Sequence, residues 1–166
     1  MSTDERGGDR GVSLSEQERG ALDGIVGHYP DRRAAAATAM RVLQQYRGWL
    51  ADETLADLGA YLGVSVAQLD GLATFANGLF RRPVGRHVVL VCDNFACWAL
   101  GHAELREAIE AQLGVGMGET TPDGRFTLLP IVCLGACDRG PAMMIDADLH
   151  GPVAPHEVVA ILEAYG

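Results

Sequence analysis

The chain has 166 residues, of which 48% are hydrophobic, so it can bury a core and is too apolar to be disordered throughout. Its net charge of −9 argues against nucleic acid and against an anionic membrane surface as partners. All 13 basic residues are arginine. The absence of lysine excludes Schiff-base catalysis and the lysine of a nucleotide-binding P-loop.

The sequence contains no targeting or membrane-spanning signal that we recognise. No apolar run approaches the roughly 18 residues that cross a bilayer, and "MSTDERGGDRG" is not a signal peptide. We therefore expect no direct membrane insertion and a location in the reducing cytoplasm, where stable disulfides are uncommon.

The first half of the chain is predicted to be helical. Residues 1–13 are polar and glycine-rich, which is typical of a disordered tail. Capping-box sequences at Ser15–Glu18 and Ser65–Gln68 each predict the start of a helix. Between them, apolar residues at helical spacing predict two further helices, over about 32–46 and 53–62. Residues 14–83 are therefore expected to form a helical domain.

The hydrophobic period changes after residue 83. The run "HVVLVC" predicts a buried strand at 87–92, and a helix follows over about 102–113. Two more strands are predicted within 126–133 and 142–146, the first at a sheet edge or with a bulge because it contains Pro130. A last helix begins near Pro155. This order fits a thioredoxin-like α/β domain over residues 84–166, preceded by the helical domain.

The four cysteines form two close pairs. Cys92 and Cys97 are separated by four residues, and Cys133 and Cys137 by three. Each pair directly follows a predicted strand. If the two strands are neighbours in one sheet, both loops emerge at the same edge and the four sulfurs can converge. That arrangement suits a metal centre.

The spacing favours iron–sulfur ligation over zinc. A structural zinc site with four cysteines prefers two-residue spacing, whereas two irons bridged by two sulfides form a wider group that suits longer loops. Small residues beside the cysteines would let backbone N–H groups approach the sulfurs; they are Ala96, Gly135 and Ala136. Asp93 and Asp138 should lower the reduction potential, whereas Arg139 should raise it.

Several alternatives compete with this interpretation. The cysteines could be free, could form two disulfides, or could stabilise a docking module through zinc without redox function. A thiol–disulfide enzyme would need Cys-x-x-Cys at the start of a helix, which neither pair provides. None of the five histidines has the spacing of a metal ligand. Trp98 is expected to shield the metal centre or to fill the core, and a role at the contact with a partner is the alternative.

Five stretches resemble a known family, and the similarity as a whole runs from about Leu14 to the C-terminus. They are "HYPDRRAAAATAMRVLQQYRGWL", "LGVSVAQLDGLATF", "PVGRHVVLVC", "GETTPDGRFTLLPIVCLGAC" and "GPAMMID". The chain resembles the 2Fe–2S protein known as the E subunit of bacterial respiratory NADH:quinone oxidoreductase (complex I), a thioredoxin-like ferredoxin. One departure is Ala76 after Phe75, where the family often has tyrosine.

The resemblance implies a fold, a cofactor and partners. It implies a thioredoxin-like α/β ferredoxin domain in which Cys92, Cys97, Cys133 and Cys137 bind a 2Fe–2S cluster, one pair per iron. FMN and NADH are expected on a partner flavoprotein subunit, to which the helical domain helps to dock. The other expected partners are the remaining iron–sulfur subunits of the peripheral arm, on the inner face of the cell membrane.

The chain itself lacks the residues of a dinucleotide site. "GVGMGE" has Glu119 where the third glycine of the motif would stand, and it follows a helix instead of a strand. The expected role is thus one-electron transfer with flavin on the partner. An equivalent diaphorase subunit of an NAD-linked hydrogenase or formate dehydrogenase stays open as an alternative.

Overall fold

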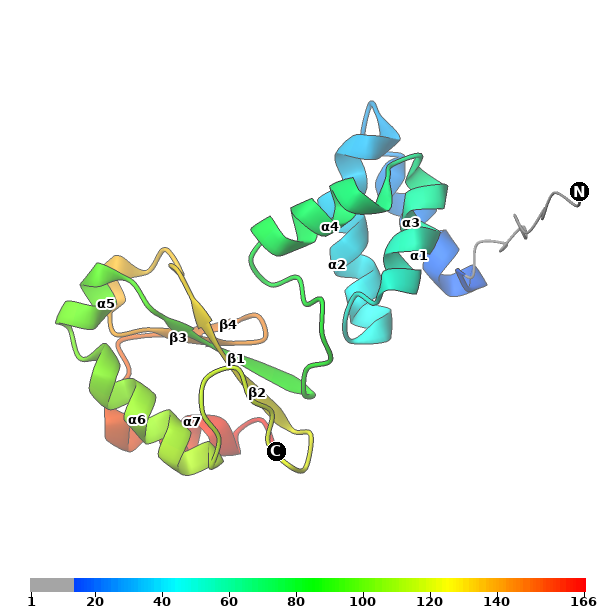
Figure 1. The fold of residues 1–166 in the computed structure, drawn as a ribbon. Coiled ribbons are helices and arrows are strands. Elements are labelled where there is room, and N and C mark those ends of the chain that lie inside the picture. The colour runs from blue at the N-terminus through cyan, green and yellow to red at the C-terminus, as the bar shows by residue number, and fades with distance from the viewer. Residues whose placement is uncertain (1–13) are drawn as a thin grey trace, which may run out of the picture. The chain divides into compact units, whose positions relative to one another are not determined.

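The fold is taken from a computed structural model that describes residues 14–166. The predicted disordered tail, residues 1–13, lies outside the described residues. The chain divides between Pro83 and Val84 into two compact units, one helical and one built around a sheet (Figure 1). We describe each unit by itself.

The helical unit contains the helices that the capping patterns and periodicity predicted. Both capping boxes are present: the Ser15 hydroxyl accepts from the Glu18 N–H, and the Ser65 hydroxyl accepts from the Gln68 N–H. The segment predicted as one helix over 32–46 begins with a 3₁₀ turn before continuing as an α-helix. The elements are α1 (Glu16–Val26), η1 (Arg32–Ala35), α2 (Ala36–Arg47), α3 (Asp52–Leu62) and α4 (Val66–Phe75).

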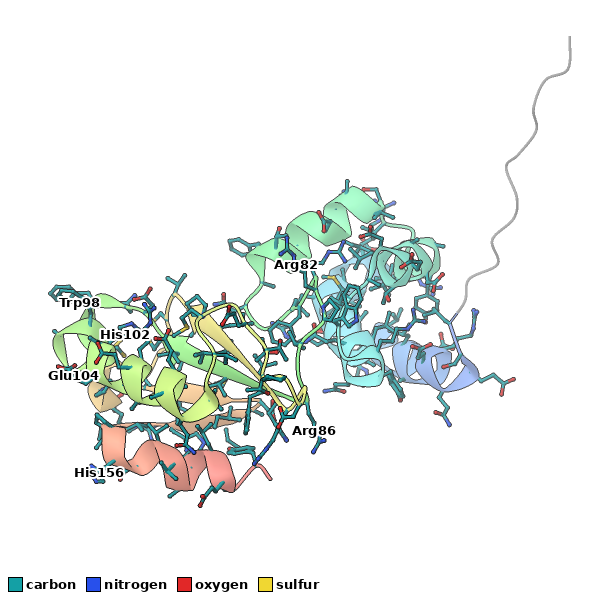
Figure 2. The ribbon with its side chains drawn as sticks, turned by 60° about the horizontal axis from the view of Figure 1, so that its bottom comes forward. Arg82, Arg86, Trp98, His102, Glu104 and His156 are labelled. Carbon is teal, nitrogen blue, oxygen red and sulfur yellow. The ribbon has the colours of Figure 1, made fainter. Side chains whose placement is uncertain are left out.

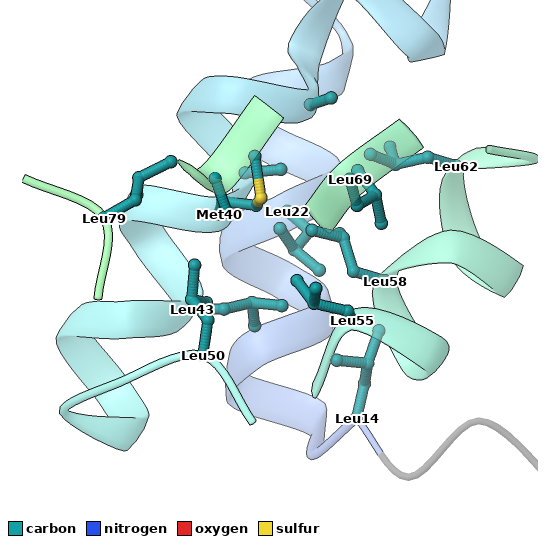
Figure 3. Close-up of a cluster of buried hydrophobic side chains, with 13 residues drawn as sticks. Leu14, Leu22, Met40, Leu43, Leu50, Leu55, Leu58, Leu62, Leu69 and Leu79 are labelled. Carbon is teal, nitrogen blue, oxygen red and sulfur yellow. The ribbon is translucent and has the colours of Figure 1, made fainter. Parts of the chain in front are cut away.

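The core of the helical unit is built largely from leucine (Figure 3). Each helix contributes its apolar stripe, as the periodicity requires. Leu14, which precedes the first capping box, packs into this core as well. The side chains that are fully buried here include Leu22, Met40, Leu43, Leu50, Leu55, Leu58 and Leu69.

A partly buried ion pair joins residues of α1 and α2 that lie 29 positions apart in the sequence. The Arg47 guanidinium donates to both carboxylate oxygens of Glu18, at 2.6 and 3.0 Å, and also reaches Asp57 at 3.4 Å. Glu18 is only 5% exposed. The hydrogen bond from Arg47 lowers the pKa of Glu18 to about 2. The pair therefore stabilises the folded helical unit in its charged form.

Side-chain hydrogen bonds hold the segment that follows α4 against the helices of this unit. Gln44 donates to the Gly78 carbonyl at 2.8 Å and accepts from the Phe80 N–H at 2.7 Å. Arg81 pairs with Asp70 and also bonds the Leu50 carbonyl. These contacts make residues 78–81 part of the helical unit.

The second unit is a four-stranded mixed sheet with helices. Its strand order is β2-β1-β3-β4, with β1 parallel to β2 and antiparallel to β3. This order of elements, following the helices, confirms the predicted α/β fold class. The elements are β1 (His87–Cys92), α5 (Phe95–Ala99), α6 (His102–Leu113), β2 (Phe126–Ile131), η2 (Cys137–Arg139), β3 (Met143–Ile145), β4 (Asp148–His150), η3 (Pro155–Glu157) and α7 (Val158–Glu163).

The main core of this unit lies between the sheet and two helices. Figure 1 shows α6 and α7 beside each other below the sheet. Leu105 and Ile109 of α6 pack with Leu162 of α7 against the sheet. The strand residues in this core are Val89, Val91, Phe126, Leu128, Met143 and Ile145. Among residues 14–166, no helix combines the length and the hydropathy needed to cross a bilayer.

Strand β2 is an edge strand, as its proline predicted. Its only named neighbour among the described strands is β1, with Val91 opposite Pro130 and Cys92 opposite Ile131. Pro130 is exposed and lacks an N–H to donate, which an edge position tolerates. The C-terminal ends of β1 and β2 therefore lie side by side.

Candidate metal centre

The predicted cysteine pairs emerge at one end of the sheet. Cys92 is the last residue of β1, and Cys97 lies in the short helix α5 that follows it. Cys133 comes two residues after the end of β2, and Cys137 begins η2. Since β1 and β2 are adjacent and parallel, the two loops leave the sheet at the same edge. The strands that precede the two cysteine pairs are therefore neighbours in one sheet, which was the condition for the four sulfurs to converge.

The four thiols interact within pairs and differ in burial. Cys92 and Cys97 are 2% and 1% exposed, whereas Cys133 is half-buried and Cys137 is exposed. Burial, followed by a hydrogen bond with Cys92, raises the pKa of the Cys97 thiol. A hydrogen bond with Cys133 is the main cause that raises the pKa of the Cys137 thiol. Charge on Cys92 raises both of these pKa values, so the two pairs also interact with each other electrostatically.

The thiols are arranged as two pairs and not around a single point. Among residues 14–166, no three or more histidine, cysteine or acidic side chains are grouped so that they could hold one metal ion. Two pairs of thiols correspond to the requirement of a two-iron cluster, in which each iron takes two protein ligands. The donor chemistry therefore fits such a cluster.

Glycines bring the backbone close to the sulfurs, as the sequence suggested. Gly135 has a φ of +75°, and its N–H donates to the Cys133 sulfur at 3.3 Å. A Cβ on Gly140 would lie 2.9 Å from the Leu100 side chain and 3.4 Å from the Cys97 sulfur. The Gly135 N–H would stabilise negative charge on a bound cluster, and the absence of a side chain at Gly140 leaves room beside the Cys97 sulfur.

Large apolar side chains surround the cysteines on the surface. Phe95, Trp98 and Leu100 are 83%, 67% and 54% exposed, and Val132, beside Cys133, is 73% exposed. Figure 2 shows Trp98 projecting away from the body of the unit. Of the three expectations for Trp98, filling of the core is therefore wrong, whereas shielding of the metal centre and contact with a partner stay open. Phe95, Leu100 and Val132 were not singled out from the sequence, although each lies within three residues of a predicted ligand.

One histidine lies close to the cysteines without being a candidate ligand. His102, at the start of α6, is 7% exposed, and its Nδ1 lies 3.1 Å from the Cys92 carbonyl oxygen (Figure 2). His87 pairs instead with Asp146 at 2.7 Å, and His150 contacts the Tyr165 hydroxyl at 3.0 Å. The His102 contact spans ten residues, and no simple spacing rule predicts it.

Comparison with known proteins identifies the family. Residues 22–166 match the family described as thioredoxin-like [2Fe-2S] ferredoxin. The chain belongs to this family. Membership confirms the thioredoxin-like fold and the predicted 2Fe–2S cofactor.

Relatives across nearly the full length give a narrower assignment. The chain is 48% identical over 152 residues to a protein of Pseudomonas aeruginosa and 43% identical to one of Escherichia coli, each named as the E subunit of NADH-quinone oxidoreductase. The alignments cover 92% of this chain and 92% of each relative. The chain thus also belongs to the family of these E subunits, which confirms the resemblance.

A solved structure shares the fold at lower sequence similarity. An NAD+-reducing [NiFe]-hydrogenase in the air-oxidized state aligns with a TM-score of 0.67 and 22% identity. The alignment covers 79% of this chain but only 22% of the hydrogenase chain. At this identity the likeness concerns the fold alone.

Proposed function

We propose that this protein is the electron-transferring E subunit of a bacterial NADH:quinone oxidoreductase and holds its 2Fe–2S cluster with Cys92, Cys97, Cys133 and Cys137. The observation that carries the proposal is the pairing of these four thiols at the ends of two adjacent parallel strands, in a chain of the thioredoxin-like ferredoxin family. A bound cluster of this type supplies a carrier for single electrons.

The protein's own residues would hold and tune the cluster. Cys92 and Cys97 would bind one iron from the buried side, and Cys133 and Cys137 would bind the other nearer the surface. The Gly135 N–H, already directed at a ligand sulfur, would stabilise the more negative reduced state. No general acid or base is required, because the chain carries an electron and no proton transfer is assigned to it.

The proposed electron donor is FMN on a partner flavoprotein subunit that oxidises NADH. NADH gives up two electrons as a hydride, whereas the cluster takes one, so flavin must stand between them. The relatives are named as subunits of NADH-quinone oxidoreductase, which supports a place in a complex with other subunits. We further propose that residues 14–83 help to dock this chain, and that the complex places it on the inner face of the membrane beside other iron–sulfur subunits.

Metal content and magnetic resonance test the cluster directly. Protein purified without oxygen should be red-brown, contain about two irons and two acid-labile sulfides per chain, and give a paramagnetic signal after reduction. Colourless protein with one zinc ion per chain would instead support the zinc-stabilised docking module and refute the cluster.

Substitution tests the ligand set. Cys133→Ala should abolish the iron–sulfur absorbance, whereas Val132→Ala, an exposed neighbour in the same loop, should retain it. The far-ultraviolet circular dichroism of both variants should still show the helical unit. An unchanged cluster spectrum in Cys133→Ala would remove Cys133 from the proposed ligands.

Isolation from the native host distinguishes the respiratory complex from a diaphorase. We expect the tagged chain to co-purify with a flavin-containing, NADH-oxidising chain and with quinone reductase activity. Co-purification with a hydrogenase or formate dehydrogenase would replace the proposal by the diaphorase alternative. The relatives with 43–48% identity favour the first outcome.

A further inference from the structure

The inference concerns the backbone at Cys92, where the sheet ends beside the metal centre. Val91 is opposite Met143 in the antiparallel pairing of β1 and β3, so Cys92 is opposite Ala142. In an antiparallel ladder, two residues of a hydrogen-bonded pair exchange both N–H···O=C bonds. The Cys92 N–H does donate to the Ala142 carbonyl at 3.1 Å.

The carbonyl of Cys92 has a side-chain partner from another element. It lies 3.1 Å from His102 Nδ1, at the start of α6. The backbone of Cys92 is thus joined to Ala142 through its N–H and to α6 through its carbonyl.

The chemistry of His102 suits the carbonyl that it faces. A carbonyl oxygen only accepts, so Nδ1 carries the hydrogen and donates it. Cys92 and His102 are 2% and 7% exposed, so water does not readily replace this bond. Without the imidazole, the buried Cys92 carbonyl would lack that donor, and the nearest backbone alternative is the Ala142 N–H opposite it. His102 Nε2 lies 3.6 Å from Asp93, beyond hydrogen-bond distance.

We propose that His102 is a positioning residue of the metal centre: by donating to the Cys92 carbonyl, it holds the loop that carries Cys92 and Cys97 against the start of α6. The inference rests on the proposed function, since it assumes that these cysteines hold the cluster. His102 itself binds no iron. Its effect reaches the cluster through the backbone of Cys92.

Four variants of the full-length, cluster-loaded chain test this role. His102→Phe keeps a planar ring of similar size but removes the donor. His102→Asn places an amide nitrogen at the bond position of Nδ1, whereas His102→Gln places it at the position of Nε2. His156→Phe is the matched control, because His156 is exposed at η3 in the same unit (Figure 2).

The readouts are the midpoint potential, from a reductive titration followed by electron paramagnetic resonance, and the rate of cluster loss to an iron chelator. Removing the donor should shift the potential of His102→Phe away from that of His156→Phe, because the backbone that carries a ligand sulfur is no longer held in place. Cluster loss should become about tenfold faster, as expected for one hydrogen bond of ordinary net strength. His102→Asn should stay near the unmodified protein, and His102→Gln should resemble His102→Phe.

Each outcome decides the inference. A potential and a loss rate in His102→Phe equal to those of His156→Phe would overturn it. If His102→Phe does not fold, the two amide variants decide: equal behaviour of His102→Asn and His102→Gln would contradict a role for Nδ1. Absence of a cluster from the unmodified protein would instead refute the proposed function.

Discussion

The two units of this protein differ in where their cysteine and exposed apolar residues lie. The helical unit contains no cysteine, and its core is closed by leucine side chains. The sheet unit has a comparable core under its helices, but a separate small cluster at one end joins Cys92, Cys97, Ala136 and Ala142. Leucine packing and the Glu18–Arg47 ion pair account for the first unit. In the second, two of the proposed ligands belong to the small cluster at the end of the sheet.

The difference extends to the surface. In the sheet unit, four of the most exposed apolar side chains lie within three residues of a proposed ligand: Phe95, Trp98, Leu100 and Val132. Isolated exposed apolar residues are normal, but a group of them beside a functional centre indicates a contact surface. The comparison teaches that folding and function draw on separate sets of residues in this chain.

Removal of the cofactor should have the largest effect of all the changes, and this effect should be confined to the sheet unit. We expect a chelator under reducing conditions to abolish the iron–sulfur absorbance and the amide-exchange protection of residues 92–97 and 133–142. The protection of residues 36–47 should stay unchanged, because the leucine core contains no ligand. Loss of protection in both segments would show that the helical unit depends on the cluster.

A cavity in the leucine core should instead destabilise the helical unit and leave the cluster in the sheet unit intact. Leu58 is fully buried, so Leu58→Ala should lower the free energy of unfolding of the helical unit by about 3 kcal/mol. Hydrogen exchange should report this loss, while the cluster absorbance stays intact. Leu128→Ala, at a fully buried position of the sheet unit, is the matched variant and should weaken protection there instead. Loss of the cluster in Leu58→Ala would contradict independent units.

The ion pair of the helical unit should make its stability depend on pH. Glu18→Gln keeps a capping-box side chain but loses the charge that Arg47 binds, and should cost on the order of 2 kcal/mol at neutral pH. The pKa of Glu18 lies at about 2 in the folded protein, below its ordinary value of 4.5. The stabilisation is therefore complete above pH 4.5 and disappears as the pH falls towards 2.

Unfolding titrations at several pH values measure this effect. The difference in unfolding free energy between the unmodified chain and Glu18→Gln should shrink steadily below pH 4.5. A difference that stays constant down to pH 2 would assign the loss to packing or capping instead of charge.

The smallest effect on stability is expected at the surface beside the cysteines. Trp98 is 67% exposed, so Trp98→Ala should change the free energy of unfolding by less than about 0.5 kcal/mol. Association with the flavin-containing partner should nevertheless weaken, which a pull-down at several salt concentrations would measure. Unchanged association would exclude Trp98 from the contact surface.

Local sequence rules predicted most of the elements because their causes are local. Ser15 and Ser65 bond N–H groups three residues away, and Pro130 restricts its own strand to an edge. The missed helix α5 has only five residues, too few to establish a period. Without a period, the sequence could not show which side of this segment Trp98 lies on, so filling of the core stayed among its expected roles until the structure showed the side chain to be 67% exposed.

The contacts that sequence reasoning could not supply join distant residues. Arg47 and Glu18 are 29 positions apart, and His102 reaches Cys92 over ten. Neither spacing corresponds to a helix or strand period, so these contacts follow only from the three-dimensional arrangement. The positions of the cysteine pairs could be predicted from the sequence, because each pair lies at or near the end of a strand that an apolar run predicts.

Because the four thiols are buried to different degrees, the order in which they react should report how far the metal centre has opened. A bulky alkylating reagent that reaches only solvent-exposed sulfur should first modify Cys137 and then Cys133. Cys92 and Cys97, at 2% and 1% exposure, should react only after the strand ends open. Mass spectrometry of partly labelled chains would thus order the steps by which cofactor loss spreads inward.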